Sequence, residues 1–184
     1  MKEEIVKQSI KHFHRKGFSQ TSIQDIVDSL GVTKGTFYYY FPSKEDLLME
    51  INLRYIEDIL NKQAAIIKDK TKDAKTKVID VITMLITSID KTGDSAKIFF
   101  REMRNLSLDH LELILRKRKE FFMNLQRVVE EGIEQKEFRS DLRADMVTFA
   151  ILGMCNWSHH WFRSDGEVPD VELAGMFADM ILNG

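Results

Sequence analysis

Two short apolar segments separated by a glycine constrain the fold of this chain more than any other feature. Residues 21–30 read TSIQDIVDSL and residues 32–41 read VTKGTFYYYF, with Gly31 between them. In each segment a hydroxyl residue precedes the apolar positions, as at the first position of many helices. Glycine tolerates the positive φ that a tight turn between crossing helices requires. The pattern therefore predicts two short helices that share one core.

A longer amphipathic helix is predicted before this pair, over residues 3–16, and Gly17 is its natural end. After the pair, Pro42 ends the last short helix, because the residue before a proline disfavours helical φ and ψ. The core of the resulting helix-turn-helix is expected at Ile26, Leu30, Val32 and Phe37. We therefore predict a three-helix domain over residues 1–45 and a larger helical domain over residues 46–184.

The remainder of the chain also has the pattern of helices. The chain has only two prolines, and its apolar residues recur at helical spacing. Ser43 is expected to cap the first of these helices, and Gly93 is expected to separate the second from the third. The predicted ranges are 44–68, 73–91, 95–106, 109–136, 143–163 and 170–182. The sequence thus predicts an all-α fold.

Several classes of protein are not expected from this composition. The amino terminus lacks the apolar segment of a secretory signal, and no run approaches the roughly 18 apolar residues of a membrane span. One cysteine allows no internal disulfide. The adjacent His159 and His160 point to different sides of a helix, so we expect no metal and no cofactor. Phosphate-binding loops and nucleophile motifs are absent from the sequence. We expect a cytoplasmic protein that is neither an enzyme nor bound to a membrane.

The segments GFSQTSIQDI, from Gly17, and GVTKGTFYYYFPSKEDLL, from Gly31, closely resemble the signature of TetR-family transcriptional repressors. The resemblance covers about residues 4–50 and is strongest over residues 33–44. One departure is Val27, where the family usually has alanine. The resemblance implies a regulator that binds double-stranded DNA. The net charge of −2 provides no general attraction to DNA, so binding must depend on local placement of charge.

A recognition helix places its amino-terminal residues near base edges in the major groove. Lys34 can donate to a guanine or a phosphate, and Gly35 lets the backbone approach closely. The three adjacent tyrosines are expected to spread over the exposed face, although each could instead lie at the edge of the core. Lys44 is expected to meet a phosphate at a helix start. The predicted DNA-contacting residues are Thr21, Ser22, Thr33, Lys34, Gly35, Thr36, Tyr38, Tyr39, Tyr40 and Lys44.

Two helices near the carboxyl terminus predict a homodimer. The helix over residues 143–163 is apolar on two sides, and such a helix is buried on both. The last helix has small residues on one face and larger apolar residues on another. The small residues are Ala174, Gly175 and Ala178, and the larger ones are Leu173, Phe177 and Met180. Two such helices from each of two chains would form a four-helix interface, and a two-fold protein suits a palindromic operator.

An effector site is predicted from Arg118, which lies on the apolar stripe of the helix over residues 109–136. It needs an anion, a carboxylate such as Glu102 or Glu112, or access to solvent. The stretch from Gly153 to Glu167 resembles the carboxyl-terminal motif of TetR-family regulators that respond to acyl-CoA and control fatty-acid degradation. That resemblance implies a fatty acyl-CoA effector, although the two tryptophans could simply pack in the core or interface. The predicted effector-binding residues are Arg101, Arg104, Arg118, Phe122, Asn156, Trp157, His160 and Trp161.

Three functions are compatible with this sequence. The leading hypothesis is a repressor that a small-molecule effector releases from DNA by shifting an existing conformational equilibrium. A second is a regulator of the multidrug type, whose effector is an amphiphilic cation; such a pocket would use carboxylates and aromatic rings. The third is a helical adaptor that uses the amino-terminal helices only to bind proteins.

Overall fold

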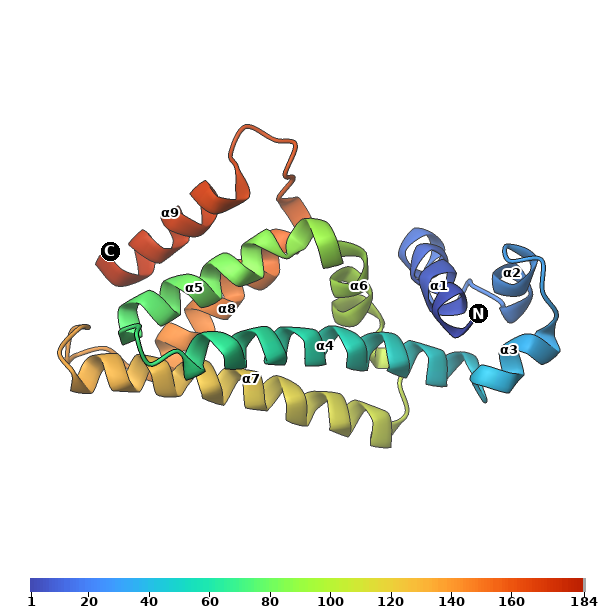
Figure 1. The fold of residues 1–184 in the computed structure, drawn as a ribbon, viewed down its shortest axis with the longest axis horizontal. Helices are drawn as coiled ribbons and strands as arrows, with labels where there is room; N and C mark the ends of the chain where they lie inside the picture. Colours follow the sequence, from blue (N-terminus) through green and yellow to red (C-terminus); the bar gives the residue numbers. More distant parts are fainter. Residues whose placement is uncertain (184) are drawn as a thin grey trace. The chain divides into compact units, whose positions relative to one another are not determined.

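The structure is a computed structural model and describes residues 1–183. Every regular element in this range is helical, which confirms the predicted all-α fold (Figure 1). A short 3-10 helix over Met103–Asn105 follows the sixth α-helix. The α-helices are α1 (Lys2–Lys16), α2 (Ile23–Asp28), α3 (Lys34–Tyr40), α4 (Lys44–Lys68), α5 (Ala74–Thr87), α6 (Ile89–Glu102), α7 (Leu108–Glu134), α8 (Ala144–Trp161) and α9 (Asp170–Asn183).

The break between α5 and α6 differs from the prediction. Gly93 was expected to separate the two helices, but it lies inside α6, and the break falls at Ser88. The Ser88 hydroxyl donates to the carbonyl oxygen of Met84 at 2.6 Å. A hydroxyl that bonds to the preceding turn competes with the backbone ladder and favours a bend. The break therefore falls at a serine, and a helix interior accommodates the glycine.

The chain forms two compact units. Unit 1 contains Met1–Glu57 and Asp94–Arg116, and unit 2 contains Asp58–Gly93 and the residues from Lys117 onward. The helices α4, α6 and α7 each contribute residues to both units. The boundary predicted at residues 45 and 46 lies within α4 and stays a prediction.

The core of unit 1 forms around the first three helices. Helix α1 packs against α2, and α2 packs against α3. The fully buried side chains include Ile5 and Phe13 of α1, Ile26 of α2 and Phe37 of α3. Gly31 has a φ of +65°, as the turn between α2 and α3 requires. Of the four predicted core residues, Ile26 and Phe37 are thus fully buried, whereas Leu30 and Val32 are half-buried.

Unit 2 is organised around α5, which packs against both α8 and α9, while α8 also contacts α9. The residues of α9 that are buried are Leu173, Ala174 and Ala178. Two of the three small residues are thus buried within this chain, where their size permits the close approach of neighbouring helices. Gly175 is exposed. The small residues of α9 therefore pack mainly against helices of the same protomer.

A buried polar contact joins α4 and α7 within unit 2. The Gln63 side chain is fully buried, and its amide nitrogen donates to the carbonyl oxygen of Phe121 at 2.9 Å. The amide nitrogen of Asn124 in turn donates to the Gln63 side-chain oxygen at 3.2 Å. Both polar ends of the Gln63 amide are therefore satisfied, as a buried amide requires.

Candidate DNA-binding surface and effector domain

Helix α3 has one anchoring residue and one open face. The Phe37 ring is fully buried and lies near the rings of Phe41 and Tyr38, with centroids 5.9 and 5.6 Å away. On the other side, Tyr38 is 52% exposed and Tyr39 is 81% exposed. The Tyr40 side chain is half-buried, and its ring meets the edge of Tyr39. Two of the three tyrosines are therefore displayed as predicted, and Tyr40 lies at the edge of the core.

The amino-terminal end of α3 is ordered by a hydroxyl cap. The Thr33 hydroxyl oxygen accepts from the backbone N–H of Thr36 at 3.3 Å and lies 3.3 Å from the Thr36 hydroxyl. Lys34 and Gly35 are exposed beside this cap. A Cβ added at Gly35 would make only an ordinary contact, 3.5 Å from the Thr33 hydroxyl oxygen. The fold does not require a glycine here, so the exposed backbone is available for close approach by another molecule.

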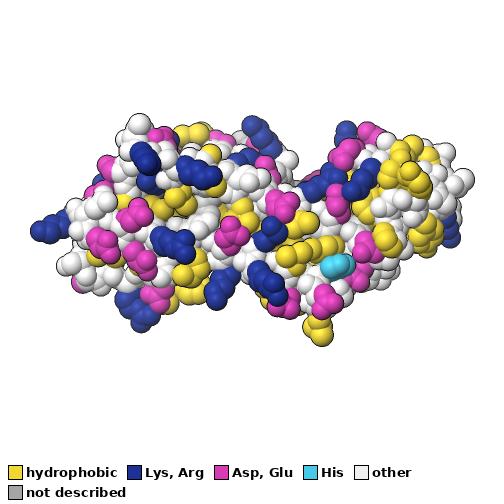
Figure 2. All heavy atoms as spheres, turned by 60° about the horizontal axis from the view of Figure 1, so that its bottom comes forward, with side chains coloured by type: hydrophobic (Ala, Val, Ile, Leu, Met, Phe, Trp, Pro, Cys, Tyr) yellow, Lys and Arg dark blue, Asp and Glu magenta, His cyan; other side chains and the backbone are white. Residues whose placement is uncertain are grey.

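Positive and negative charges are nearly balanced in this chain. Acidic and basic side chains are interspersed over the visible face of the molecule, without an extended region of one sign (Figure 2). This distribution agrees with the net charge of −2. Long-range attraction to DNA is therefore weak, and recognition must come from individual contacts such as those that Lys34 can make.

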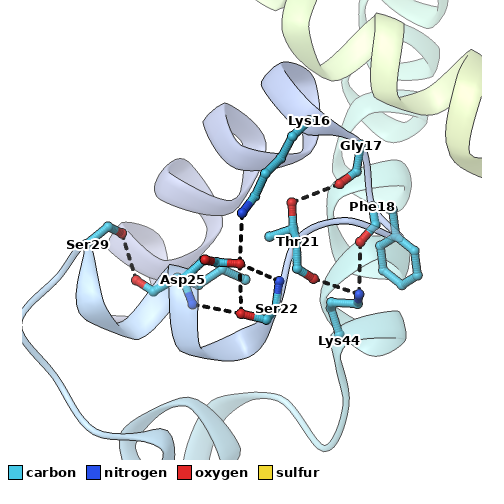
Figure 3. A network of polar contacts seen from close by, with 9 residues as sticks. Lys16, Gly17, Phe18, Thr21, Ser22, Asp25, Ser29 and Lys44 are labelled. Atoms are coloured by element: carbon cyan, nitrogen blue, oxygen red, sulfur yellow. Dashed lines mark hydrogen bonds and ion pairs between the residues drawn. The ribbon is translucent and has the colours of Figure 1, made fainter.

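The start of α2 is held by a reciprocal cap and an ion pair (Figure 3). The Ser22 hydroxyl oxygen accepts from the Asp25 N–H at 3.1 Å, and the Asp25 carboxylate accepts from the Ser22 N–H at 2.7 Å. The ammonium group of Lys16 lies 2.9 Å from the same carboxylate. The bond from Lys16, followed by those from Ser22, holds the pKa of Asp25 far below its usual value. The sequence indicated a hydroxyl cap at this helix, but not the ion pair between Lys16 and Asp25.

The structure does not support two of the predicted phosphate contacts. The Thr21 side chain is fully buried, and its hydroxyl donates to the Gly17 carbonyl oxygen at 2.8 Å. The Lys44 ammonium group donates to the carbonyl oxygens of Phe18 and Thr21 at 2.8 and 2.7 Å (Figure 3). Burial lowers the pKa of Lys44 from its usual value. Both side chains are thus occupied within the protein, whereas Ser22 is exposed with its hydroxyl bonded to Asp25.

Two further contacts within unit 1, which the sequence did not reveal, hold α4. The Arg54 guanidinium donates to both carboxylate oxygens of Glu3 on α1, at 2.6 and 2.8 Å. The Glu45 carboxylate accepts from the backbone N–H of Ser107 at 2.6 Å and lies 2.9 Å from the ring Nδ1 of His110. The bond from the Ser107 N–H is the main reason that the pKa of Glu45 is lowered. These contacts join residues more than 50 positions apart, so no local pattern could indicate them.

Helices α8 and α9 contact each other, and both expose large apolar side chains. We call this exposed set the α8/α9 face; its members are Met146, Phe149, Trp157 and Trp161 of α8 and Met176 and Met180 of α9. Gly153, at the same helical spacing, is also exposed and has open space around it. Exposed apolar groups gathered in this way mark interaction sites in soluble proteins. The sequence predicted that one of the two apolar sides of α8 meets a partner subunit.

The eight predicted effector-binding residues are divided between the two units. Arg101 and Arg104 belong to unit 1, and the other six belong to unit 2. The Arg101 guanidinium donates to the Glu102 carboxylate at 2.7 Å and to the backbone carbonyl oxygen of Phe13. Arg101 therefore joins α6 to the end of α1, and the structure does not support its prediction as an effector contact. Arg104 is exposed.

The α8 members of that set are Asn156, Trp157, His160 and Trp161. All but Asn156 are exposed, and the Trp157 and His160 rings lie 4.8 Å apart. The half-buried ring of Phe122 on α7 lies 4.6 Å from that of Phe149. The tryptophans thus lie on the α8/α9 face, which favours the alternative that they pack in an interface.

Arg118 is half-buried on α7. Each of the two carboxylates considered as its partner has a different arginine partner. Glu102 binds Arg101, with 2.7 Å between the bonded atoms, and Glu112 binds Arg116. Arg118 therefore stays a predicted contact for an anionic effector. In residues 1–183 we find no group of three His, Cys, Asp or Glu side chains placed to hold a metal ion.

Comparison with known proteins identifies the family. Residues 5–51 match the family described as "Bacterial regulatory proteins, tetR family". Residues 71–184 match the family described as "Tetracyclin repressor-like, C-terminal domain". The chain belongs to the TetR family. The predicted family is thus confirmed, and the chain is a DNA-binding transcriptional regulator. No helix of the described range could span a membrane.

Relatives of similar length support this assignment. The HTH-type transcriptional repressor KstR2 of Rhodococcus jostii is 26% identical over 174 residues, which cover 94% of this chain and 84% of that protein. The fatty acid metabolism regulator protein of Bacillus subtilis is 23% identical over 182 residues, which cover 98% and 93% of the two chains.

Solved structures show the same fold. The TetR-family regulator PfmR of Thermus thermophilus has a TM-score of 0.90 and 27% identity, and the match covers 98% of this chain and 97% of that one. The regulator AibR, solved with isovaleryl coenzyme A and operator DNA, has a TM-score of 0.89 and 20% identity, with the same coverage. The second likeness shows the fold alone.

Proposed function

We propose that this TetR-family protein is a cytoplasmic repressor that binds a palindromic operator as a homodimer and leaves it when a small-molecule effector binds. The observation that carries the proposal is the exposed face of α3. Lys34, Gly35, Tyr38 and Tyr39 are displayed there while Phe37 anchors the helix in the core. Such a helix can enter a major groove without disturbing the packing beneath it. The protein-adaptor alternative does not fit a member of this family.

The α8/α9 face supports the homodimer. Phe149, Trp157 and Met180 are each about half exposed or more. Burying a side chain of this size contributes about 1.5–3 kcal/mol. A second copy of the same face would cover these groups and create a two-fold axis. Two recognition helices related by that axis would read half-sites about 34 Å apart.

An acyl-CoA thioester is the effector class that we propose for unit 2. AibR was solved with isovaleryl coenzyme A, and a relative from Bacillus subtilis is named a fatty acid metabolism regulator. Within this chain, Arg118 supplies a cation for the phosphate groups, and Phe122 supplies apolar surface near it on α7. A cationic effector would instead require carboxylates and aromatic rings.

The proposal can be tested with a labelled duplex from the region upstream of the chain's own coding sequence. Fluorescence anisotropy would measure operator affinity with acyl-CoAs of several chain lengths, free coenzyme A, fatty acids and organic cations. We expect an acyl-CoA to weaken binding by about 5- to 150-fold, the usual range of coupling between two sites. Arg118→Met should reduce this response and leave the effector-free affinity unchanged.

Release by cations alone would show the multidrug type of effector. Failure of the effector-free protein to bind the duplex more tightly than a scrambled one would contradict the choice of operator. Binding that stays non-specific across selected sequence libraries would contradict the regulator itself.

A further inference from the structure

The Lys44 ammonium group makes three contacts within the protein. Its ammonium group lies 2.8 Å from the Phe18 carbonyl oxygen, 2.7 Å from the Thr21 carbonyl oxygen and 4.3 Å from the centroid of the Phe18 ring. An ammonium group has three N–H donors. Figure 3 shows the two hydrogen bonds to the carbonyl oxygens. A phosphate oxygen would therefore compete with these internal contacts.

These contacts join the two ends of the helix-turn-helix. Thr21 directly precedes Ser22, which caps α2, and Lys44 is the first residue of α4, after α3. The hydrogen bond from Lys44 to the Thr21 carbonyl oxygen therefore joins the two ends of the segment over residues 22–43. Because α2 packs against α3, holding the two ends of this segment also restrains the recognition helix.

A second contact restrains the same segment from the other side. Lys16, the last residue of α1, pairs with Asp25 in the first turn of α2 at 2.9 Å. Lys44 thus holds the loop before α2 against α4, and Lys16 holds α2 against α1. Displacing Lys44 towards a phosphate would remove its charge-assisted bonds to two carbonyl oxygens, which favour the inward position.

We propose that Lys44 is a positioning residue: it joins the loop before α2 to the start of α4, fixes the angle at which α3 is presented, and does not bind the DNA backbone. The proposal depends on the DNA-binding function that the family establishes. It assigns to Lys44 an indirect contribution to operator affinity, made through the carbonyls of Phe18 and Thr21.

The salt dependence of DNA binding separates the two roles. Each phosphate contact contributes about −0.9 to the slope of log affinity against log salt concentration. Loss of a phosphate contact from both subunits would therefore make the slope less steep by about 1.8. For Lys44→Met we expect operator affinity to fall by about tenfold or more at every salt concentration, with the slope unchanged.

Hydrogen exchange on the free protein provides the second readout, and it needs no DNA. In Lys44→Met, the amides of residues 18–26 should exchange faster, because their loop has lost its bonds to α4. Lys34→Met is the matched control: it removes an exposed lysine from α3 and should weaken DNA binding without changing exchange in this loop. Lys44→Arg, which keeps donors for both carbonyls, should retain most of the protection.

Three outcomes would overturn the proposal. The first is a salt slope for Lys44→Met that becomes less steep by about 1.8 while hydrogen exchange in the loop is unchanged. The second is an unchanged operator affinity of Lys44→Met. The third is unchanged hydrogen exchange in both Lys44 variants. If Lys44→Met does not fold, Lys44→Arg still decides between the roles. In the free protein, an arginine that binds the two carbonyls keeps the loop exchange slow, whereas fast loop exchange with an unchanged operator affinity would show that the carbonyl contacts do not set that affinity.

Discussion

Helices α3 and α8 both expose large aromatic rings, but the two surfaces differ in how they meet water. On α3 the exposed rings are Tyr38 and Tyr39, each with a phenolic hydroxyl, and Lys34 is exposed nearby. On α8 the exposed rings include Phe149 and Trp157, 59% and 65% exposed, beside methionines. A hydroxyl keeps its hydrogen bonds in water, while a phenyl ring or thioether gains by leaving it. The chemistry at the tip of each side chain therefore indicates the partner: a duplex for α3 and another apolar surface for α8.

The two helices also differ in how they are anchored. Helix α3 has seven residues, and Phe37 is its buried side chain. Helix α8 has 18 residues, and its buried members include Ile151 and Cys155. A short helix with one anchor depends on its neighbours for orientation, which is why the contacts of Lys16 and Lys44 matter for α3. The longer helix is held by its own packing.

The largest expected effect comes from placing charge on the α8/α9 face. Phe149→Glu combined with Trp157→Glu should convert the dimer to a monomer, because a carboxylate cannot be buried unpaired in an apolar interface. Light scattering coupled to size-exclusion chromatography would measure the mass. We expect operator affinity to fall at least about 100-fold, since one subunit reads only one half-site.

Lys70→Glu is the matched control for this change, because it alters an exposed residue between α4 and α5. It should leave the mass and the operator affinity unchanged. A double variant that stays dimeric would show that another surface forms the dimer.

An intermediate effect is expected on α3. Lys34→Ala and Tyr39→Ala should each weaken operator binding about tenfold, because each removes a group that can reach a base edge or phosphate. Both residues are exposed, so the thermal midpoint and the dimer mass should remain those of the parent protein. Unchanged affinity at moderate salt in both variants would show that the α3 face is not the DNA-binding surface.

The smallest effect concerns acid stability, which should distinguish the polar support of α3 from the apolar α8/α9 face. The pKa of Asp25 is depressed by Lys16 and Ser22, so its stabilising contribution is present above the ordinary aspartate value of about 3.9 and is lost as pH falls below it. Asp25→Asn should therefore lower the thermal midpoint by a few degrees at pH 7, and the difference should shrink towards pH 3.

Differential scanning calorimetry of both proteins at several pH values would measure this difference. A gap between parent and variant that is the same at pH 7 and pH 3 would show that the Asp25 carboxylate does not stabilise α2 through its charge. Comparing the two proteins at each pH removes the contribution of the other carboxylates, which titrate in both.

Short-range sequence features were sufficient for most of the helices. The expected caps were Thr33, Ser43 and either Thr21 or Ser22. In the structure Ser22, Thr33 and Ser43 each accept a bond from the backbone N–H three residues later. A cap and its partner lie within one turn, so nothing distant decides the contact. The exposed face of α3 followed from the same reasoning, because the position of Phe37 on a short helix determines which neighbours point outward.

The prediction that Gly93 separates α5 from α6 was wrong, and the contacts at the observed break are also local in sequence. Ser88, Thr87 and Thr92 all bond back to carbonyl oxygens four residues earlier. Glycine lowers helix propensity, but packing on a core outweighs a cost of about 1 kcal/mol. Propensity alone therefore placed the break five residues too late.

Tertiary structure alone decided what the long side chains of Lys44 and Arg101 and the small ones of Ala174 and Ala178 contact. Lys44 meets carbonyls 23 and 26 residues away, and Arg101 meets one 88 residues away. A flexible cationic chain can turn to solvent, to DNA or to a carbonyl at similar local cost, so the atoms within its reach decide. Ala174 and Ala178 likewise suit any close helix contact, and only the fold shows that they are buried within the protomer.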